Sequence, residues 1–146
     1  MRACLLVERA RILIEATPPP AGVQLPDLLH IIDDAGMPSP TNVFIFNGDF
    51  VDRGPLGVEV MITLFALYLG CEEGSMYLNR GNHEDGSICA VYGFQGECRR
   101  KYDDMVFHMF IEVFKYLPIA SILGETVRGA AAAAQRVIRS VALYDA

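Results

Sequence analysis

The sequence lacks the features that mark several classes of protein. No two of its four cysteines form a C-x-x-C pair, so zinc-ribbon and thioredoxin signatures are absent. Reduced thiols and a cytoplasmic or nuclear location are therefore expected. The apolar patch at residues 4–7 is broken by Glu8 and Arg9, too early for a secretory signal. The longest nearly uninterrupted apolar run, Val60–Leu69, is shorter than the ~20 residues that cross a bilayer, so we expect no membrane partner.

Basic residues are also few. The chain has 12 Lys and Arg against 18 Asp and Glu, which gives a net charge of −6 and a pI of about 4.9. A nucleic-acid partner is disfavoured, because contact with a phosphate backbone needs a basic surface. No Gly-x-x-x-x-Gly-Lys-Ser/Thr loop is present, which also disfavours a nucleotide-binding protein of that kind.

Apolar side chains are abundant. They make up 52% of the residues, and the mean hydropathy is +0.28. This composition can supply a core and excludes a disordered chain, while 146 residues correspond to one domain or a piece of one. The proline run and the alanine-rich end divide the chain into an N-terminal segment with a proline-rich linker (1–23), a central segment (24–127) and an alanine-rich tail (128–146).

The apolar pattern predicts an α/β fold. Two β-branched and aromatic runs, Val43–Phe46 and Met76–Leu78, predict strands, and the apolar segment Val58–Leu69 predicts a buried helix between them. Such a βαβ unit has parallel strands, whose carboxyl ends meet at one edge of the sheet. The other expected elements are helices at 3–16, 27–35 (ended by Gly36), 93–102 and 103–116, an extended linker at 18–22, a strand at 119–123 and a helix from residue 128.

Polar motifs follow both predicted strands. Residues 47–54 read NGDFVDRG, and residues 78–85 read LNRGNHED. In open α/β sheets ligands bind at the carboxyl ends of the strands, so we expect the motifs to meet. Acids, an amide, an imidazole and a guanidinium on glycine-bordered turns can hold divalent metals and a phosphate together.

The motif residues divide among three roles. Asp49 and Asn82 offer oxygen ligands for a metal ion. Asp52 would accept a hydrogen bond from His83 and fix its tautomer, so that His83 can protonate a departing alkoxide. Arg53 presents a planar fork for two phosphate oxygens. With a metal-bound hydroxide as nucleophile, this set predicts in-line hydrolysis of a phosphate ester without a covalent phosphoenzyme.

Each motif alone has a simpler interpretation. An isolated Asp-x-x-Asp-Arg-Gly is usually a solvated turn, and an isolated Asn-His-Glu can be a helix cap. Their joint occurrence after two strands favours a metal-dependent phosphoesterase. Glu84 is expected to be a structural partner rather than a catalytic residue. His30 is interpreted as a surface or core residue, His108 as a packing residue, and residues 92–94 as a turn.

The chain resembles the phosphoprotein phosphatase family of serine/threonine phosphatases. Residues 47–54 match the family's second signature motif, and residues 80–84 match its third. The amino-acid sequence of the second motif is most similar to the type 5 and EF-hand-containing branch. The resemblance runs from about residue 24 to about residue 127. It implies a partial serine/threonine phosphatase catalytic domain at 24–127, between a divergent N-terminal segment (1–23) and a divergent alanine-rich tail (128–146). Matching flanks lie at 27–29, 36–39, 92–94 and 114–118.

The resemblance implies a metallophosphoesterase α/β/β/α sandwich built from βαβ units, here partial and with an incomplete sheet. It implies two divalent metal ions (Mn, Fe or Zn) and hydrolysis of phosphoserine and phosphothreonine in proteins. By position, Asp49 bridges both metals, and Asn82 binds the second metal and contributes to phosphate binding. His83 is the general acid, Asp52 its partner and Arg53 a phosphate clamp. A phosphoprotein is the implied substrate, and no regulatory partner is indicated.

The chain departs from the family pattern on both sides of the motifs. The Asp and His that bind the first metal fall on Pro20 and Gly22, which cannot ligate through side chains. After Val127, alanines replace the family's further histidine ligands and second phosphate-binding arginine, and no tetratricopeptide or EF-hand module is present. A second hypothesis is therefore a catalytically inactive truncated fragment or a pseudophosphatase.

Overall fold

In the described part of the chain, the main sheet has three parallel strands. The computed structural model describes residues 11–12, 24–123 and 126–130. The strands lie in the order β1 (Arg11–Ile12), β2 (Phe44–Phe46) and β3 (Met76–Leu78). β2 and β3 pair in parallel with Ile45 opposite Tyr77, so the predicted βαβ unit and α/β class are confirmed.

The first strand differs from the sequence-based expectation. A helix was predicted over residues 3–16, but Arg11–Ile12 pairs in parallel with Phe44 and Ile45 of β2. The prediction was wrong there because an open edge of β2 offers backbone partners, and such tertiary pairing overrides a weak helical pattern. The rest of that predicted helix and the linker at 18–22 lie outside the described residues.

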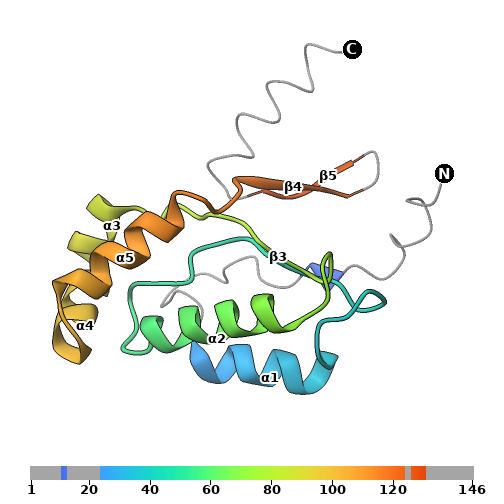
Figure 1. Cartoon of the computed structure of the whole chain (residues 1–146), viewed down its shortest axis with the longest axis horizontal. Coiled ribbons are helices and arrows are strands. Elements are labelled where there is room, and N and C mark those ends of the chain that lie inside the picture. Colours follow the sequence, from blue (N-terminus) through green and yellow to red (C-terminus); the bar gives the residue numbers. More distant parts are fainter. Residues whose placement is uncertain (1–10, 13–23, 124–125, 131–146) are drawn as a thin grey trace, which may run out of the picture.

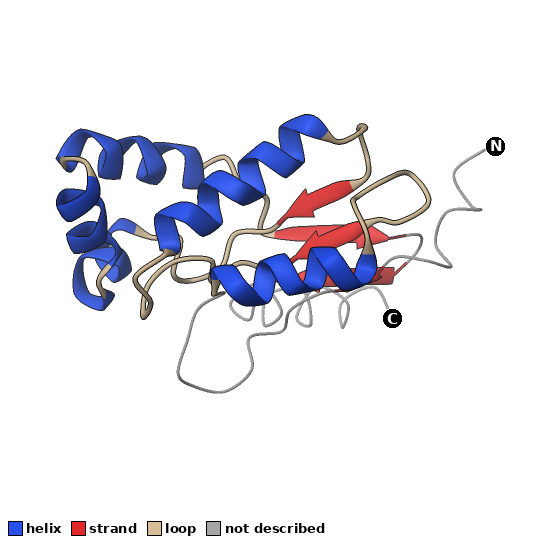
Figure 2. Cartoon of the chain, turned by 90° about the horizontal axis from the view of Figure 1, so that it is seen from below, coloured by secondary structure: helices blue, strands red, loops and turns tan. Residues whose placement is uncertain are grey.

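Two helices cover one face of this sheet. α1 (Leu25–Ala35) and α2 (Gly57–Gly70) lie side by side there (Figures 1 and 2). Gly36, with φ of +79°, ends α1 as predicted. The apolar contacts join both helices to the strands through fully buried side chains, among them Leu28, Phe44, Phe46, Met61 and Leu64. α2 is not buried all round, because Ile62, Tyr68 and Leu69 are exposed.

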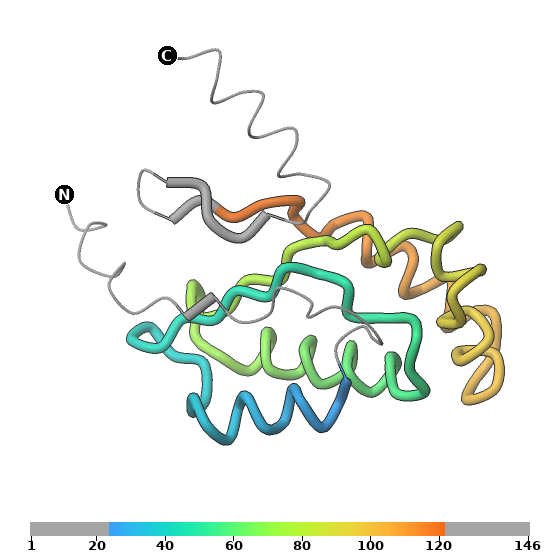
Figure 3. Tube along the Cα trace, turned by 180° about the vertical axis from the view of Figure 1, so that it is seen from behind, coloured from blue at the N-terminus to red at the C-terminus, as the bar shows by residue number. Residues whose placement is uncertain are grey.

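Three helices gather beyond the carboxyl ends of β2 and β3 (Figure 3). They are α3 (Gly86–Tyr92), α4 (Phe94–Lys101) and α5 (Asp104–Phe114). α4 and α5 confirm the helices predicted at 93–102 and 103–116. α3 was not predicted, because its seven residues, which begin with Gly86, give too short an apolar pattern. It begins where the Asp85 side chain accepts the Ser87 N–H.

A hairpin lies on the side of the main sheet opposite α1 and α2 (Figures 1 and 2). Its strands are β4 (Ala120–Leu123) and β5 (Thr126–Ala130), paired antiparallel. β4 confirms the predicted strand. The helix predicted from residue 128 is wrong for residues 128–130, where pairing with β4 prevails, and the rest of that segment lies outside the described residues. With these two short sheets, the described residues form a partial α/β domain.

None of the helices in the described part of the chain has the length and apolarity needed to cross a bilayer.

Candidate functional site

The loops after β2 and β3 touch through their backbones at two glycines. A Cβ at Gly48 would overlap the backbone N and Cα of Gly81, and a Cβ at Gly81 would overlap the backbone N of Asp49. Gly48 also has a φ of +89°, a conformation that side chains disfavour. Glycine at both positions therefore lets the two motifs meet, as the parallel strands predicted.

The first motif has an unusual backbone. Asp49, Asp52 and Arg53 have φ values of 58°, 75° and 59°, in the left-handed region. Each such residue costs on the order of 1 kcal/mol, and conformations of this kind persist only where surrounding contacts hold them. They concentrate at functional sites, where side chains need directions that a relaxed loop does not supply.

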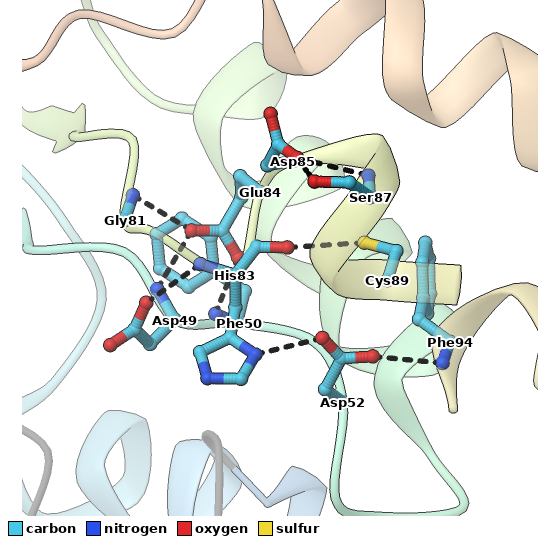
Figure 4. Close-up of polar contacts among 10 residues, drawn as sticks. All are labelled: Asp49, Phe50, Asp52, Gly81, His83, Glu84, Asp85, Ser87, Cys89 and Phe94. Atoms are coloured by element: carbon cyan, nitrogen blue, oxygen red, sulfur yellow. Dashed lines mark hydrogen bonds and ion pairs between the residues drawn. The ribbon is translucent and has the colours of Figure 1, made fainter. Parts of the chain in front are cut away.

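Glu84 supplies much of that surrounding contact. Its carboxylate is fully buried and accepts the backbone N–H groups of Asp49, Phe50 and Gly81, each at 2.8 Å (Figure 4). Burial raises its pKa from the usual 4.5 to about 7, against the opposing effect of the three N–H donors and with a smaller contribution from the nearby Asp49 charge. This geometry agrees with the structural role predicted for Glu84.

His83 and Asp52 form a buried pair. His83 Nδ1 lies 2.7 Å from Asp52 Oδ2, and the two residues are 5% and 3% exposed. The other carboxylate oxygen, Oδ1, accepts the backbone N–H of Phe94 at 2.8 Å (Figure 4). Because a carboxylate only accepts hydrogen bonds, it holds the proton on Nδ1. Within the described residues, no hydrogen bond is made by Nε2, so that atom is left for a ligand.

Tyr92 joins this pair to Arg53. Its ring meets the His83 ring edge-on at 5.4 Å between centroids, and the Arg53 guanidinium carbon lies 5.5 Å from the centre of the same ring. The Tyr92 carbonyl accepts the Arg53 backbone N–H at 3.4 Å. Arg53 itself is exposed, which leaves its guanidinium accessible to a phosphate. Sequence reasoning assigned Tyr92 only to a turn.

Asp49 and Asn82 lie at the same edge. Asp49 is half-buried and accepts the His83 backbone N–H through Oδ1 at 3.2 Å, while Asn82 is exposed. These two residues offer a carboxylate and an amide oxygen for hard cations. No group of three or more His, Cys, Asp or Glu within the described ranges could hold a metal ion. The described donors thus do not fit a complete two-metal centre, and Pro20 and Gly22 lie outside these ranges.

The remaining histidines are away from this edge. His30 is an exposed residue of α1, and its Nε2 lies 3.4 Å from Asp34. His108 is exposed on α5 beside the ring of Phe107, so the packing role predicted for it is wrong. Both sit on the outer surfaces of their helices.

A buried imidazole–carboxylate pair beside an exposed guanidinium, on the loops of an α/β sheet, is an arrangement suited to a phosphate ester. The chain belongs to the calcineurin-like phosphoesterase family, whose model matches residues 21–141. Within it, the chain is similar to serine/threonine-protein phosphatase T of Schizosaccharomyces pombe, with 48% identity over 100 residues, covering 68% of this chain and 21% of the relative. It is 46% identical over 104 residues to human serine/threonine-protein phosphatase 5, covering 71% of this chain and 21% of the relative.

A solved structure shows the same likeness. The chain matches a protein serine/threonine phosphatase from Saccharomyces cerevisiae, described as similar to human phosphatase PP5, with a TM-score of 0.65 and 38% identity. The match covers 68% of this chain and 31% of that one. The resemblance to serine/threonine phosphatases and the partial α/β domain are thus confirmed, and the chain spans about a fifth of the length of these curated relatives.

Proposed function

We propose that this chain acts as a protein serine/threonine phosphatase, a hydrolase of phosphoserine and phosphothreonine esters in proteins. Relatives with 46–48% identity carry that name. The observation that carries the proposal is the buried His83–Asp52 pair, 2.7 Å apart, placed beside the exposed Arg53. His83 can donate a proton to the leaving oxygen, and the Arg53 guanidinium can bind two phosphate oxygens. Cleavage of a phosphate ester needs both of these functions.

In this proposal the chain's own residues bind the phosphate and move one proton. Arg53 donates to two non-bridging phosphate oxygens, and the Asn82 amide adds a donor. As water attacks phosphorus, its protons stay on the phosphate, the bond to the serine or threonine oxygen breaks, and His83 gives the proton on Nε2 to that oxygen. The phosphate then releases a proton to solvent, and Nε2 of His83 takes one up from solvent. Asp52 accepts Nδ1–H throughout, which keeps the ring oriented.

Metal binding is a separate part of the proposal. We propose manganese as the ion to test, which Asp49 and Asn82 would hold through their side-chain oxygens. Because the described donors do not complete such a centre, we assign no chemical step to a metal. The same observation favours a second candidate function: a non-catalytic relative that binds phosphate groups through Arg53 without turnover.

One assay separates the two candidates. The purified chain is given a phosphoserine peptide and excess manganese beside the variants His83→Ala and His108→Ala, the second being a surface control. A phosphatase should lose about 10²–10⁴-fold in turnover with His83→Ala and nothing with His108→Ala. Equal turnover in the chain and in His83→Ala contradicts the catalytic proposal.

The non-catalytic candidate has its own readout. It predicts no turnover above His83→Ala and no manganese retained on dialysis, measured by elemental analysis. It also predicts phosphate binding, measured by ³¹P NMR line broadening, that is lost in Arg53→Ala. Phosphate binding that survives Arg53→Ala contradicts both candidates.

The proposal also includes a cellular location and a class of substrate. A cytoplasmic or nuclear location is supported by the unpaired thiols of Cys71, Cys89 and Cys98 in the described ranges. The substrate is proposed to be a phosphoprotein.

A further inference from the structure

An apolar groove of about 480 Å³ lies between the C-terminal parts of α2 and α5. Phe65 and Leu69 of α2, Tyr77 of β3, and Val113, Tyr116 and Pro118 are among its lining residues. Leu69 is 81% exposed and Tyr116 is 85% exposed. A single exposed apolar side chain is ordinary, but a contiguous set around a hollow marks an interaction site. None of the proposed site residues lines it.

The groove continues toward an acidic end. A second hollow of about 450 Å³ shares Tyr68, Leu69 and Tyr77 with the first and extends to Glu72 and Glu73. Both glutamates are exposed, and neither forms an ion pair with any described residue. The two hollows therefore adjoin at the three shared side chains, and the second one brings two carboxylates next to the apolar groove.

The end of α2 adds to this negative charge. The helix ends at Gly70, next to the glutamates, and its last turn holds no basic residue. The C-terminus of a helix carries about half a negative charge, which cationic side chains normally offset. Here the helix end and two carboxylates together favour a cation brought by another molecule.

We propose that this groove binds a short amphipathic helix of a partner protein, with an apolar face and Lys or Arg at the end that reaches Glu72 and Glu73. The apolar side chains of the helix would enter the groove beside Leu69 and Tyr116, as in other helix-in-groove complexes. The basic end would meet Glu72, Glu73 and the carboxyl end of α2. An acidic helix is excluded by repulsion at the same place.

The test uses two fluorescent model peptides of about 14 residues, or about four helical turns, one built of Leu and Lys and the other of Leu and Glu in the same pattern. Fluorescence anisotropy with the whole chain should show the Leu/Lys peptide binding at least about tenfold more tightly. Leu69→Glu or Tyr116→Glu should abolish that binding. Met37→Glu, at a position that is 62% exposed and outside the groove, should leave it unchanged.

A charge exchange makes the test specific. The double variant Glu72→Lys, Glu73→Lys should reverse the preference, so that the Leu/Glu peptide binds more tightly. Circular dichroism of each variant checks the fold, which substitutions at such exposed positions leave intact. Binding that ignores Leu69→Glu and Tyr116→Glu, or a preference that survives the charge exchange, overturns the proposal. So does a dimer of the chain, seen by size-exclusion chromatography, that Leu69→Glu dissociates, because a second copy would then be the occupant.

Discussion

Glu84 holds the two motif loops to each other. It belongs to the second motif, yet two of its three N–H donors, Asp49 and Phe50, belong to the first. We expect Glu84→Gln to lower the free energy of unfolding by about 2 kcal/mol, because the amide nitrogen cannot accept a hydrogen bond and leaves buried N–H groups without a partner. Urea unfolding followed by circular dichroism measures the loss.

The same side chain gives a pH dependence. The pKa of Glu84 in the folded chain, about 7, lies above its ordinary value of 4.5. The folded state therefore binds this proton more tightly than the unfolded state, and the contribution of Glu84 to stability falls as the pH rises from 4.5 toward 7. The deficit of Glu84→Gln should accordingly be larger at pH 5 than at pH 8. A deficit that grows with pH would show that the N–H donors outweigh burial.

The residues of the site were predictable to different degrees. Asp52 and His83 could be paired from the sequence, because each follows a strand of one βαβ unit and parallel strands end at the same edge. Tyr92 could not be placed, because its contact with Arg53 depends on the path of α3, a helix too short to leave a pattern. The one sequence signal for Tyr92 was the similarity of residues 92–94 to the phosphatase family. That similarity does not say which side chains Tyr92 contacts.

Helix α2 begins with help from a distant helix. Its own N-cap residue, Leu56, has no side-chain hydrogen bond to offer. Instead, the buried carboxylate of Glu97 in α4 accepts the backbone N–H groups of Gly57 at 3.2 Å and Val58 at 2.9 Å. The carboxylate thus satisfies two donors at the helix start and opposes its positive end.

Removing this carboxylate should uncouple α2 from α4. We expect Glu97→Ala to lower the free energy of unfolding by about 2 kcal/mol, as the loss of a strong helix cap does. Glu112→Ala is the matched control, because Glu112 pairs with Lys115 on the exposed surface of α5 and should contribute under about 0.5 kcal/mol. Thermal unfolding of both variants provides the comparison, and equal losses would contradict the capping role.

The local sequence pattern predicted those helices and strands that pack against elements close to them in the sequence. β2, α2 and β3 were predicted because each carries a long or strongly apolar run between turn residues. β1 and β5 were missed because both exist through pairing with a distant or reversed strand, Arg11–Ile12 with β2 and Thr126–Ala130 with β4. Hydrogen-bond partners of that kind leave no mark on local periodicity.

The whole molecule depends on an aromatic cluster between the helices and the site. The ring of Phe94 is fully buried and lies 5.3 to 6.4 Å from the rings of Phe107, Phe110 and Phe114 on α5. The backbone N–H of Phe94 holds Asp52 at the same time. Packing of α5 and orientation of the imidazole–carboxylate pair are therefore linked through one residue.

This linkage leads to a prediction for the entire fold. Phe94→Ala should cost about 3–5 kcal/mol, because it removes a large ring from a packed interior and leaves a cavity. Domains are commonly stable by only about 5–15 kcal/mol. Much of this variant should therefore already be unfolded at 37 °C, and its cooperative unfolding transition should be weak. Val91→Ala, at a position that is 77% exposed, should stay within about 0.5 kcal/mol of the parent chain. Calorimetry that finds the two variants equally stable would mean that α4 and α5 do not pack on the site through Phe94.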